Sequence, residues 1–161
     1  MLPPKIIECP RDAMQGIKPF IPTSAKVSYL QFLLQVGFHS LDFGSFVSDR
    51  AVPQMRDTAS VLDQLDLSKT KTKLLAIIAN LRGAEIALNF QQIEYLGFPF
   101  SISENFQMRN THKTIAESLE SLKKIKELTD KLNKTLVVYL SMGFGNPYGD
   151  PWSVDVVLKW V

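Results

Sequence analysis

The feature that most constrains the fold is an alternation along the chain between short apolar runs and longer segments of helical periodicity. The short runs are apolar over most of their length, which is typical of strands buried on both faces of a parallel sheet. We predict five such strands, at residues 5–9, 40–45, 73–80, 94–98 and 135–142. Strands that alternate with helices in this way indicate an α/β fold in which helices cover a parallel sheet.

Helices with recognisable ends separate the predicted strands. Ser24 precedes an apolar series that repeats at helical spacing, and Gly37 follows it as a C-terminal stop. The clearest helix begins at Thr114, where Glu117 completes a capping box. Two shorter helices are expected before the third strand and after Asn80. Each predicted strand is therefore followed by a helix.

The last apolar pattern suggests that only part of a larger fold is present. Asp150 and Pro151 predict the N-cap and first turn of a final helix, and the sequence stops at Val161 without a C-terminal stop signal. A whole (β/α)8 TIM barrel takes about 250 residues, so this length corresponds to roughly five of its eight units. We therefore predict that residues 1–161 are a single domain, the first five βα units of a TIM barrel, ending inside the fifth helix.

Composition and charge exclude several classes of protein. The content of 45% hydrophobic and 21% charged residues is that of an ordinary globular domain. The net charge is only +2, with no basic stripe of the kind that binds nucleic acid. Cys9 is the single cysteine, which excludes an internal disulfide and suits a reducing compartment. No run approaches the roughly 18 apolar residues of a membrane span, so we expect a cytoplasmic protein.

Polar residues follow the predicted strands, and functional groups of a barrel gather where its strands end. Arg11 and Asp12 come directly after the first strand. We expect their side chains to point in different directions, so that the guanidinium holds an anionic oxygen while the carboxylate ligates a cation. The alternative is a surface salt bridge in an N-terminal turn. We expect Cys9 to be a buried packing residue.

Other polar groups occur at the ends of later strands. Asp42 lies inside an apolar run, and a buried carboxylate is costly unless it is paired. It can partner Arg11, either as a purely structural pair or as a group that positions substrate. Asn80 is a candidate ligand or loop anchor. Residues 100–110 are expected to form a long polar loop at the rim, and residues 143–148 a tight barrel loop.

The run from Ile6 to Gln15, IIECPRDAMQ, resembles the strand-one signature of 3-hydroxy-3-methylglutaryl-CoA lyase. It is followed in order by SFVS from Ser45, VPQM from Val52, NLRG from Asn80, YLS from Tyr139 and GNPY from Gly145. Each has a similar counterpart in that family at similar spacing. The resemblance extends from about residue 5 to the end of the sequence.

This resemblance implies a TIM-barrel enzyme that cleaves an acyl-CoA thioester, 3-hydroxy-3-methylglutaryl-CoA, into acetyl-CoA and acetoacetate. A divalent metal, Mg²⁺ or Mn²⁺, and a homodimer at full length are also implied. Asp12 matches the metal-binding aspartate, and Arg11 matches the arginine that stabilises the developing enolate. Arg11 and Asp42 are the candidate catalytic residues. The residues expected to bind substrate are Arg11, Gln15, Lys18, Ser45 and Asn80.

Three departures from the family bear on these expectations. Cys9 stands where the family usually has glycine before Pro10, and Ala13 where it has glycine after the Arg-Asp pair, so the loop conformation can differ. Asp42 stands where the better-known members have glutamate, and the family takes further metal ligands and a catalytic cysteine from strands six to eight, which this sequence lacks. Two alternatives therefore remain. One is a related aldol condensation, as in isopropylmalate or homocitrate synthases. The other is a catalytically inactive half-barrel that pairs its open edges.

Overall fold

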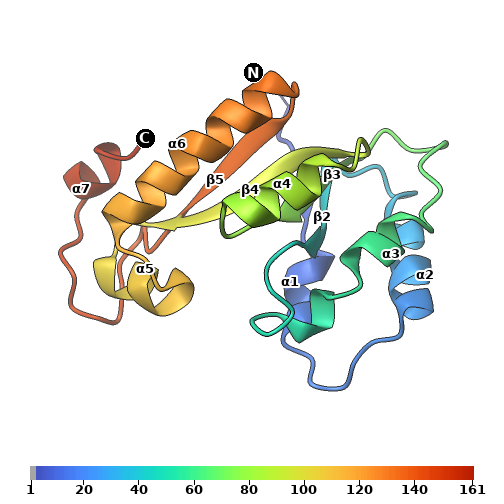
Figure 1. The fold of residues 1–161 in the computed structure, drawn as a ribbon, viewed down its shortest axis with the longest axis horizontal. Coiled ribbons are helices and arrows are strands. Elements are labelled where there is room, and N and C mark those ends of the chain that lie inside the picture. The colour runs from blue at the N-terminus through green and yellow to red at the C-terminus, as the bar shows by residue number, and fades with distance from the viewer. Residues whose placement is uncertain (1–2) are drawn as a thin grey trace.

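A computed structural model describes residues 3–161 and contains one five-stranded sheet (Figure 1). All strands are parallel, and their order across the sheet is their order along the chain. The predicted α/β architecture is therefore confirmed. The strands are β1 (Ile7–Glu8), β2 (Ser40–Ser45), β3 (Lys73–Ile77), β4 (Ile93–Ser101) and β5 (Thr135–Ser141).

The strand bounds differ from the predicted ones where the chain turns early into a helix. β1 has only two residues, because the carbonyl of Cys9 already accepts hydrogen bonds from the backbone of the following helix, with Pro10 in its first turn. β3 ends at Ile77, since Asn80 caps the next helix. β4 instead continues to Ser101, because β5 pairs with it along that whole length.

The helices follow the strands as expected, although several are short. Thr114 and Glu117 form the predicted capping box at the start of the longest helix among the described residues. The elements are α1 (Pro10–Gln15), α2 (Thr23–Leu33), the 3-10 turn η1 (Pro53–Met55), α3 (Thr58–Leu62), α4 (Leu81–Leu88), α5 (Glu104–Thr111), α6 (Ile115–Lys131) and α7 (Val154–Leu158).

The hydrophobic core lies between the sheet and its outer helices. Phe43 on β2 and Phe98 on β4 are both almost fully buried, and Ile125 of α6 packs into the same cluster. In Figure 1 the helices α4 and α6 lie across one face of the sheet, which is the face that carries these residues. Burial of this face supplies most of the hydrophobic stabilisation of the chain.

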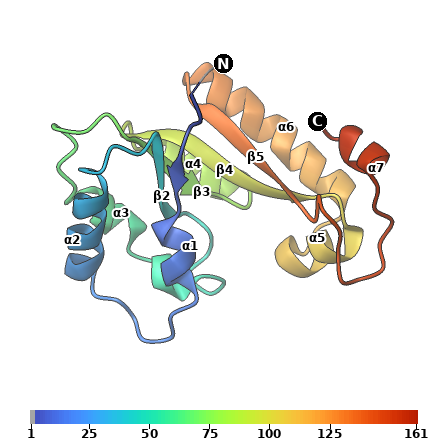
Figure 2. The same ribbon diagram turned by 180° about the vertical axis from the view of Figure 1, so that it is seen from behind.

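The other face of the sheet is turned toward the reader in Figure 2, where β4 and β5 lie in front of α6. Gly97 on β4 lets three side chains of this inner face meet. A Cβ atom there would lie 2.6 Å from Ile77 Cδ1, 3.0 Å from Tyr139 Cε2 and 3.1 Å from Leu75 Cδ2. The inner face therefore depends on a glycine at the centre of β4 for its packing.

Strands β1 and β5 form the two edges of the sheet, and they are less buried than predicted. All six residues of β2 are buried, whereas β1 has none buried and β5 is half-exposed. The expectation of strands buried on both faces is thus wrong for the edges, because an edge strand has a neighbour on one side only.

Two further sequence predictions are wrong near the end of β4 and after β5. Residues 100–110 are not a long polar loop, because β4 reaches Ser101 and α5 follows with Ser103 as its N-cap. Asp150 does not cap the last helix, which begins at Val154 with Ser153 as N-cap. The Asp150 carboxylate instead accepts hydrogen bonds from Ser103 Oγ and from Asn105 at the start of α5.

Within residues 3–161, no helix combines the length and apolar character that a membrane crossing demands.

Candidate active site

The predicted site residues meet at a pocket of about 540 Å³ at the carboxyl ends of the strands. Its lining includes Cys9, which follows β1, and residues of α1 on one side, and the end of β5 on the other. We call it the reaction pocket and define it by Cys9, Arg11, Asp12, Gln15, Asp42, Ser45, Val47, Tyr139 and Ser141. This position is the one at which barrels place their functional groups.

Arg11 and Asp42 form a fork-to-carboxylate ion pair across β1 and β2. Arg11 Nε lies 3.1 Å from Asp42 Oδ1, and Nη2 lies 2.6 Å from Oδ2. The Asp42 side chain is only 1% exposed and that of Arg11 13% exposed. Because a buried carboxylate needs such a partner, the predicted pairing of Asp42 with Arg11 follows from elementary electrostatics.

Asp12 lies on the same side of Arg11, and the expectation that the two side chains point apart is wrong. Arg11 Nη1 donates to Asp12 Oδ1 at 3.0 Å and to Gln15 Oε1 at 2.9 Å. Gln15 Nε2 also donates to Asp12 Oδ1, at 2.8 Å. Residues 10–15 are helical, so Gln15 lies four positions after Arg11 and three after Asp12, and its side chain bridges the two.

The surroundings of the ion pair shift the pKa values of both Arg11 and Asp42. Burial raises the pKa of Asp42, and the hydrogen bonds and charge of Arg11 offset part of that rise. Burial opposes the charge on Arg11, but Asp42 outweighs it and the pKa of Arg11 is raised. The guanidinium is therefore permanently charged at neutral pH.

Cys9 is exposed at the edge of the reaction pocket, which corrects the expectation that it is a buried packing residue. It is exposed because the chain turns into α1 immediately after it. Desolvation, followed by the charge of Asp42, raises the pKa of its thiol. Since the thiolate is the nucleophilic form, this environment does not activate Cys9.

Tyr139 is a polar group of this pocket that sequence reasoning assigned no role. Its hydroxyl is the one buried side-chain oxygen or nitrogen within residues 3–161 that has no hydrogen-bond partner. Burial, followed by the charge of Asp42, raises the pKa of this hydroxyl to about 12. A tyrosine in the last predicted strand was visible in the sequence, but only the structure shows that this residue lines the pocket and that its buried hydroxyl lacks a partner within residues 3–161.

Known proteins of similar sequence and structure share this arrangement of strands. No family model matches the chain. A hydroxymethylglutaryl-CoA lyase of Bacillus subtilis is 33% identical over 150 residues, which are 93% of this chain and 50% of that protein. The cytoplasmic 3-hydroxy-3-methylglutaryl-CoA lyase of Rattus norvegicus is 31% identical, over 89% of this chain and 42% of that protein.

Solved structures give the same result. An HMG-CoA lyase from Acinetobacter baumannii, in complex with coenzyme A and 3-methylmalate, matches 98% of this chain and 51% of its own with a TM-score of 0.89 and 27% identity. The Bacillus subtilis HMG-CoA lyase matches 98% of this chain and 53% of its own, with a TM-score of 0.88 and 32% identity. The chain matches the N-terminal half of hydroxymethylglutaryl-CoA lyases.

The chain spans about half the length of the lyases that it matches. The resemblance read from the sequence is confirmed, and so is the TIM-barrel fold, of which the chain supplies five strands. In this half-barrel the strands thus close only part of a ring, with β1 and β5 at its two edges.

A divalent metal does not fit the described residues of this half-barrel by themselves. No group of three or more His, Cys, Asp or Glu residues within positions 3–161 could hold an ion. The carboxylate of Asp42 is engaged by Arg11, and Asp12 is the carboxylate left toward solvent, with its side chain 64% exposed. One carboxylate is too few ligands for Mg²⁺ or Mn²⁺.

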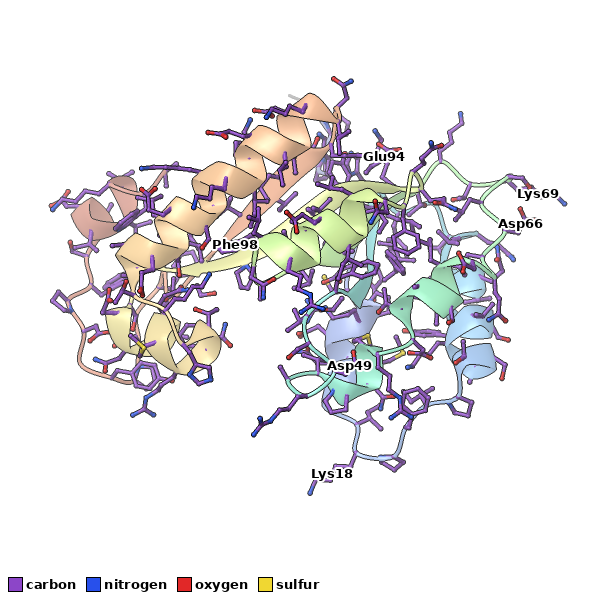
Figure 3. The ribbon with its side chains drawn as sticks, viewed as in Figure 1. Lys18, Asp49, Asp66, Lys69, Glu94 and Phe98 are labelled. Atoms are coloured by element: carbon purple, nitrogen blue, oxygen red, sulfur yellow. The ribbon has the colours of Figure 1, made fainter. Side chains whose placement is uncertain are left out.

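The remaining predicted substrate residues are Ser45, Asn80 and Lys18, of which only Ser45 lines the reaction pocket. Ser45 lines the reaction pocket, and its Oγ accepts a hydrogen bond from the backbone of Val47. Asn80 is outside that pocket and caps α4 through Gly83, so it acts here as the loop anchor that the sequence also allowed. Lys18 lies on the loop after α1 and extends away from the molecule (Figure 3).

Proposed function

We propose that this chain forms the enolate-binding half of a 3-hydroxy-3-methylglutaryl-CoA lyase, which releases acetyl-CoA and acetoacetate. The observation that carries the proposal is the orientation of Arg11 in the reaction pocket. Its Nε, both Nη1 hydrogens and one Nη2 hydrogen bind Asp42, Asp12 and Gln15. The other Nη2 hydrogen has no partner within residues 3–161 and is available to a substrate oxygen.

Cleavage of the carbon–carbon bond leaves its electron pair on the carbon next to the thioester carbonyl, which becomes an enolate. A fixed guanidinium beside that carbonyl oxygen lowers the energy of the developing negative charge. Asp42 fixes the Arg11 guanidinium through hydrogen bonds to Nε and Nη2, so the guanidinium need not reorient when negative charge develops on the substrate. Tyr139 lines the same pocket and its buried hydroxyl has no partner within residues 3–161, so it is a further candidate donor to the substrate.

We propose in addition that Asp12 contributes one ligand to a Mg²⁺ or Mn²⁺ ion whose other ligands lie outside this chain. The support is the exposure of its carboxylate beside Arg11 and the resemblance to the lyases. Such an ion supplies a Lewis acid for the alkoxide oxygen of the substrate. We also propose a homodimer at full length and a cytoplasmic location. The names of the relatives include cytoplasmic forms, in rat and human, and mitochondrial forms, in Arabidopsis thaliana and Gallus gallus.

The test is the release of acetoacetate from 3-hydroxy-3-methylglutaryl-CoA in the presence of Mg²⁺ or Mn²⁺. It is made with the longest product of the coding region and with the 161-residue chain, each before and after chelation of the metal. We expect metal-dependent release from the longer product. Its complete absence would overturn the proposal.

The lack of a metal-binding cluster within residues 3–161 favours one alternative, a catalytically inactive half-barrel. A stable dimer by sedimentation, with no metal uptake by either product, would support that alternative. A substrate panel that compares 2-oxo acids with the thioester separates the lyase from a condensing enzyme of the isopropylmalate or homocitrate synthase kind.

A further inference from the structure

Gln54 is a buried glutamine of η1 that lies outside the reaction pocket. Within residues 3–161, its side-chain amide makes three hydrogen bonds, all to the backbone of the loop after α1 (residues 16–22). Nε2 donates to the carbonyls of Ile17 at 2.8 Å and Pro19 at 3.0 Å, and Oε1 accepts from the N–H of Ile21 at 2.8 Å. Both hydrogens and the oxygen of the amide are used, which fixes the orientation of this side chain.

The loop that Gln54 holds is joined directly to the end of α1. The N–H of Ile17 donates to the carbonyl of Met14 in α1 at 3.0 Å, while the carbonyl of Ile17 accepts from Gln54. Met14 is buried, and α1 packs against η1. A single residue therefore connects the last turn of α1 to the Gln54 amide.

The backbone of Gln54 is in turn fixed by a buried cation. Lys26 Nζ of α2 donates to the Gln54 carbonyl and pairs at 2.6 Å with Asp57, the N-cap residue of α3. We call Gln54, Lys26 and Asp57 the glutamine clasp. Leu30 of α2 and Leu62 of α3 belong to the hydrophobic core, and the three helices lie together at one side of the molecule (Figures 1 and 2). The clasp thus ties the end of α1 to helices that the core holds in place.

The helix that carries Arg11 depends on such a tie. α1 has six residues and β1 before it has two, and so short a helix is not stable without tertiary contacts. Arg11 Nη1 donates to Gln15 in the last turn of α1, while its Nε and Nη2 bind Asp42 of β2. Movement of the end of α1 would therefore shift Arg11 relative to Asp42, which stays in the sheet.

We infer that Gln54 is a positioning residue for Arg11, acting through Ile17 and the last turn of α1. The inference rests on the proposed function, because that function gives the orientation of Arg11 its role in the reaction. Without the clasp, Arg11 keeps its charge but has no single place beside the substrate carbonyl. Since a misplacement of about 1 Å can lower a rate by about 10²-fold, a residue outside the pocket can control the reaction.

The first measurement follows the Arg11 guanidinium of the 161-residue chain by NMR, without turnover. Arg11 Nε donates to both carboxylate oxygens of Asp42, at 3.1 and 3.2 Å, so its hydrogen should exchange slowly with solvent. The signal is identified as the arginine Nε–H resonance that Arg11→Gln removes. Gln54→Met keeps the length of the side chain and removes its three hydrogen bonds. We expect it to accelerate the exchange by about fivefold or more.

The matched control is Gln31→Met, because Gln31 holds another loop by the same chemistry. Its Nε2 donates to the carbonyl of Asp66 at 3.0 Å, and its Oε1 accepts from the N–H of Asp66 at 2.9 Å. Neither residue lines the reaction pocket. Gln31→Met should leave the exchange of the Arg11 hydrogen within about twofold of the unaltered chain. Equal acceleration in Q31M and Q54M, or none in Q54M, would overturn the inference.

Gln54→Glu is measured alongside, so that the inference is tested even where Gln54→Met does not fold. It keeps the acceptor for the N–H of Ile21 and loses the amide donors to Ile17 and Pro19. The Arg11 hydrogen should again exchange faster, because the link from Ile17 to η1 is lost. Exchange as slow as in the unaltered chain would overturn the inference here too.

The second measurement is steady-state kinetics of the longest product of the coding region. Gln54→Met should lower kcat for acetoacetate release by about tenfold and change KM by less than about twofold, because Arg11 acts on charge that develops in the transition state. Gln31→Met should change neither. An unchanged kcat in Q54M would overturn the positioning role. Where the unaltered product releases no acetoacetate but the Arg11 exchange responds as expected, only the proposed function is contradicted.

Discussion

Two buried ion pairs of the chain have similar chemistry and very different surroundings. Arg11–Asp42 faces the reaction pocket, with a contact of 2.6 Å and side chains 13% and 1% exposed. Lys26–Asp57 joins α2 to the residue before α3, also at 2.6 Å and with side chains 2% and 12% exposed. Burial and distance alone therefore do not distinguish a functional pair from a structural one.

The difference lies in where the remaining hydrogen bonds go. Lys26 Nζ also donates to the carbonyl of Gln54 and lies 4.2 Å from the ring centroid of Phe20, while Asp57 accepts from Thr23 Oγ1 at 2.7 Å. These partners all belong to the protein, and they tie the loop after α1 to η1 and α3. Arg11 keeps one Nη2 hydrogen without a partner within residues 3–161, and that hydrogen is available to a ligand.

The largest expected effect on stability comes from Lys26–Asp57, the pair whose remaining hydrogen bonds all go to other groups of the protein. Lys26→Met leaves the Asp57 carboxylate, whose side chain is only 12% exposed, without its cation. The loss of a buried partner typically costs about 3–5 kcal/mol of unfolding free energy. Urea unfolding of the chain measures it. Lys123→Met is the matched control, because the Lys123–Glu120 pair is exposed and should cost less than about 1 kcal/mol. Similar losses in both variants would contradict the structural role of Lys26.

Arg11→Gln should act on catalysis in the longest product of the coding region. Removal of a preorganised donor to a developing oxyanion typically lowers kcat by about 10²–10³-fold. Arg11→Lys keeps the charge but loses the fork that binds Asp42, so we expect an intermediate rate. A rate of acetoacetate release within about twofold of the unaltered protein would show that Arg11–Asp42 is only a second structural pair.

The pairing of Arg11 with Asp42 could be predicted because its cause is local and general. A carboxylate inside an apolar strand needs a partner, and Arg11 follows the neighbouring strand. The strands were predictable because the strands of a parallel sheet are typically nearly continuous apolar runs, which are visible in the sequence. Errors at their ends arose where a cap, such as that made by Asn80, interrupts an apolar run.

α5 and the role of Asp150 could not be predicted, because both depend on contacts distant in sequence. α5 has few apolar residues, and its buried residue Gln107 is polar. That side chain bonds the backbone of Ser101 at 2.8 Å and Ser118 Oγ at 2.7 Å, which replaces an apolar face that periodicity would detect. Asp150 bonds Ser103 and Asn105, which precede it by more than forty positions.

Gly97→Ala should have a smaller effect, on the inner face that carries the reaction pocket. The added methyl group would lie 2.6 Å from Ile77 Cδ1 and 3.0 Å from Tyr139 Cε2, so side chains must shift, and overpacking of this kind costs about 1–3 kcal/mol. Gly16→Ala is the control, since nothing lies within 4 Å of the added atom and its φ is −87°. Urea unfolding compares the two, and equal stability of G97A and G16A would contradict the packing described for the inner face.

The smallest expected effect on stability is that of Tyr139, whose hydroxyl tests how strongly the reaction pocket excludes water. Its hydroxyl has no partner among the described residues 3–161, so Tyr139→Phe should change the unfolding free energy at neutral pH by less than about 1 kcal/mol. The pKa of the hydroxyl is raised from 10.0 to about 12 in the folded chain. The folded state therefore holds this proton more tightly than the unfolded state does. Its contribution to stability should be fully present below pH 10 and be lost as the pH rises toward about 12.

The tyrosinate absorbance of the unaltered chain, minus that of Tyr139→Phe, isolates this one hydroxyl among the four tyrosines. We expect the difference to be small at pH 10 and to develop only as the pH approaches about 12. The unaltered chain should also lose stability relative to Tyr139→Phe over the same range. A difference signal with its midpoint at the ordinary value of 10.0 would show that water reaches the hydroxyl. The pocket would then lack the desolvation that makes a fixed charge such as that of Arg11 effective.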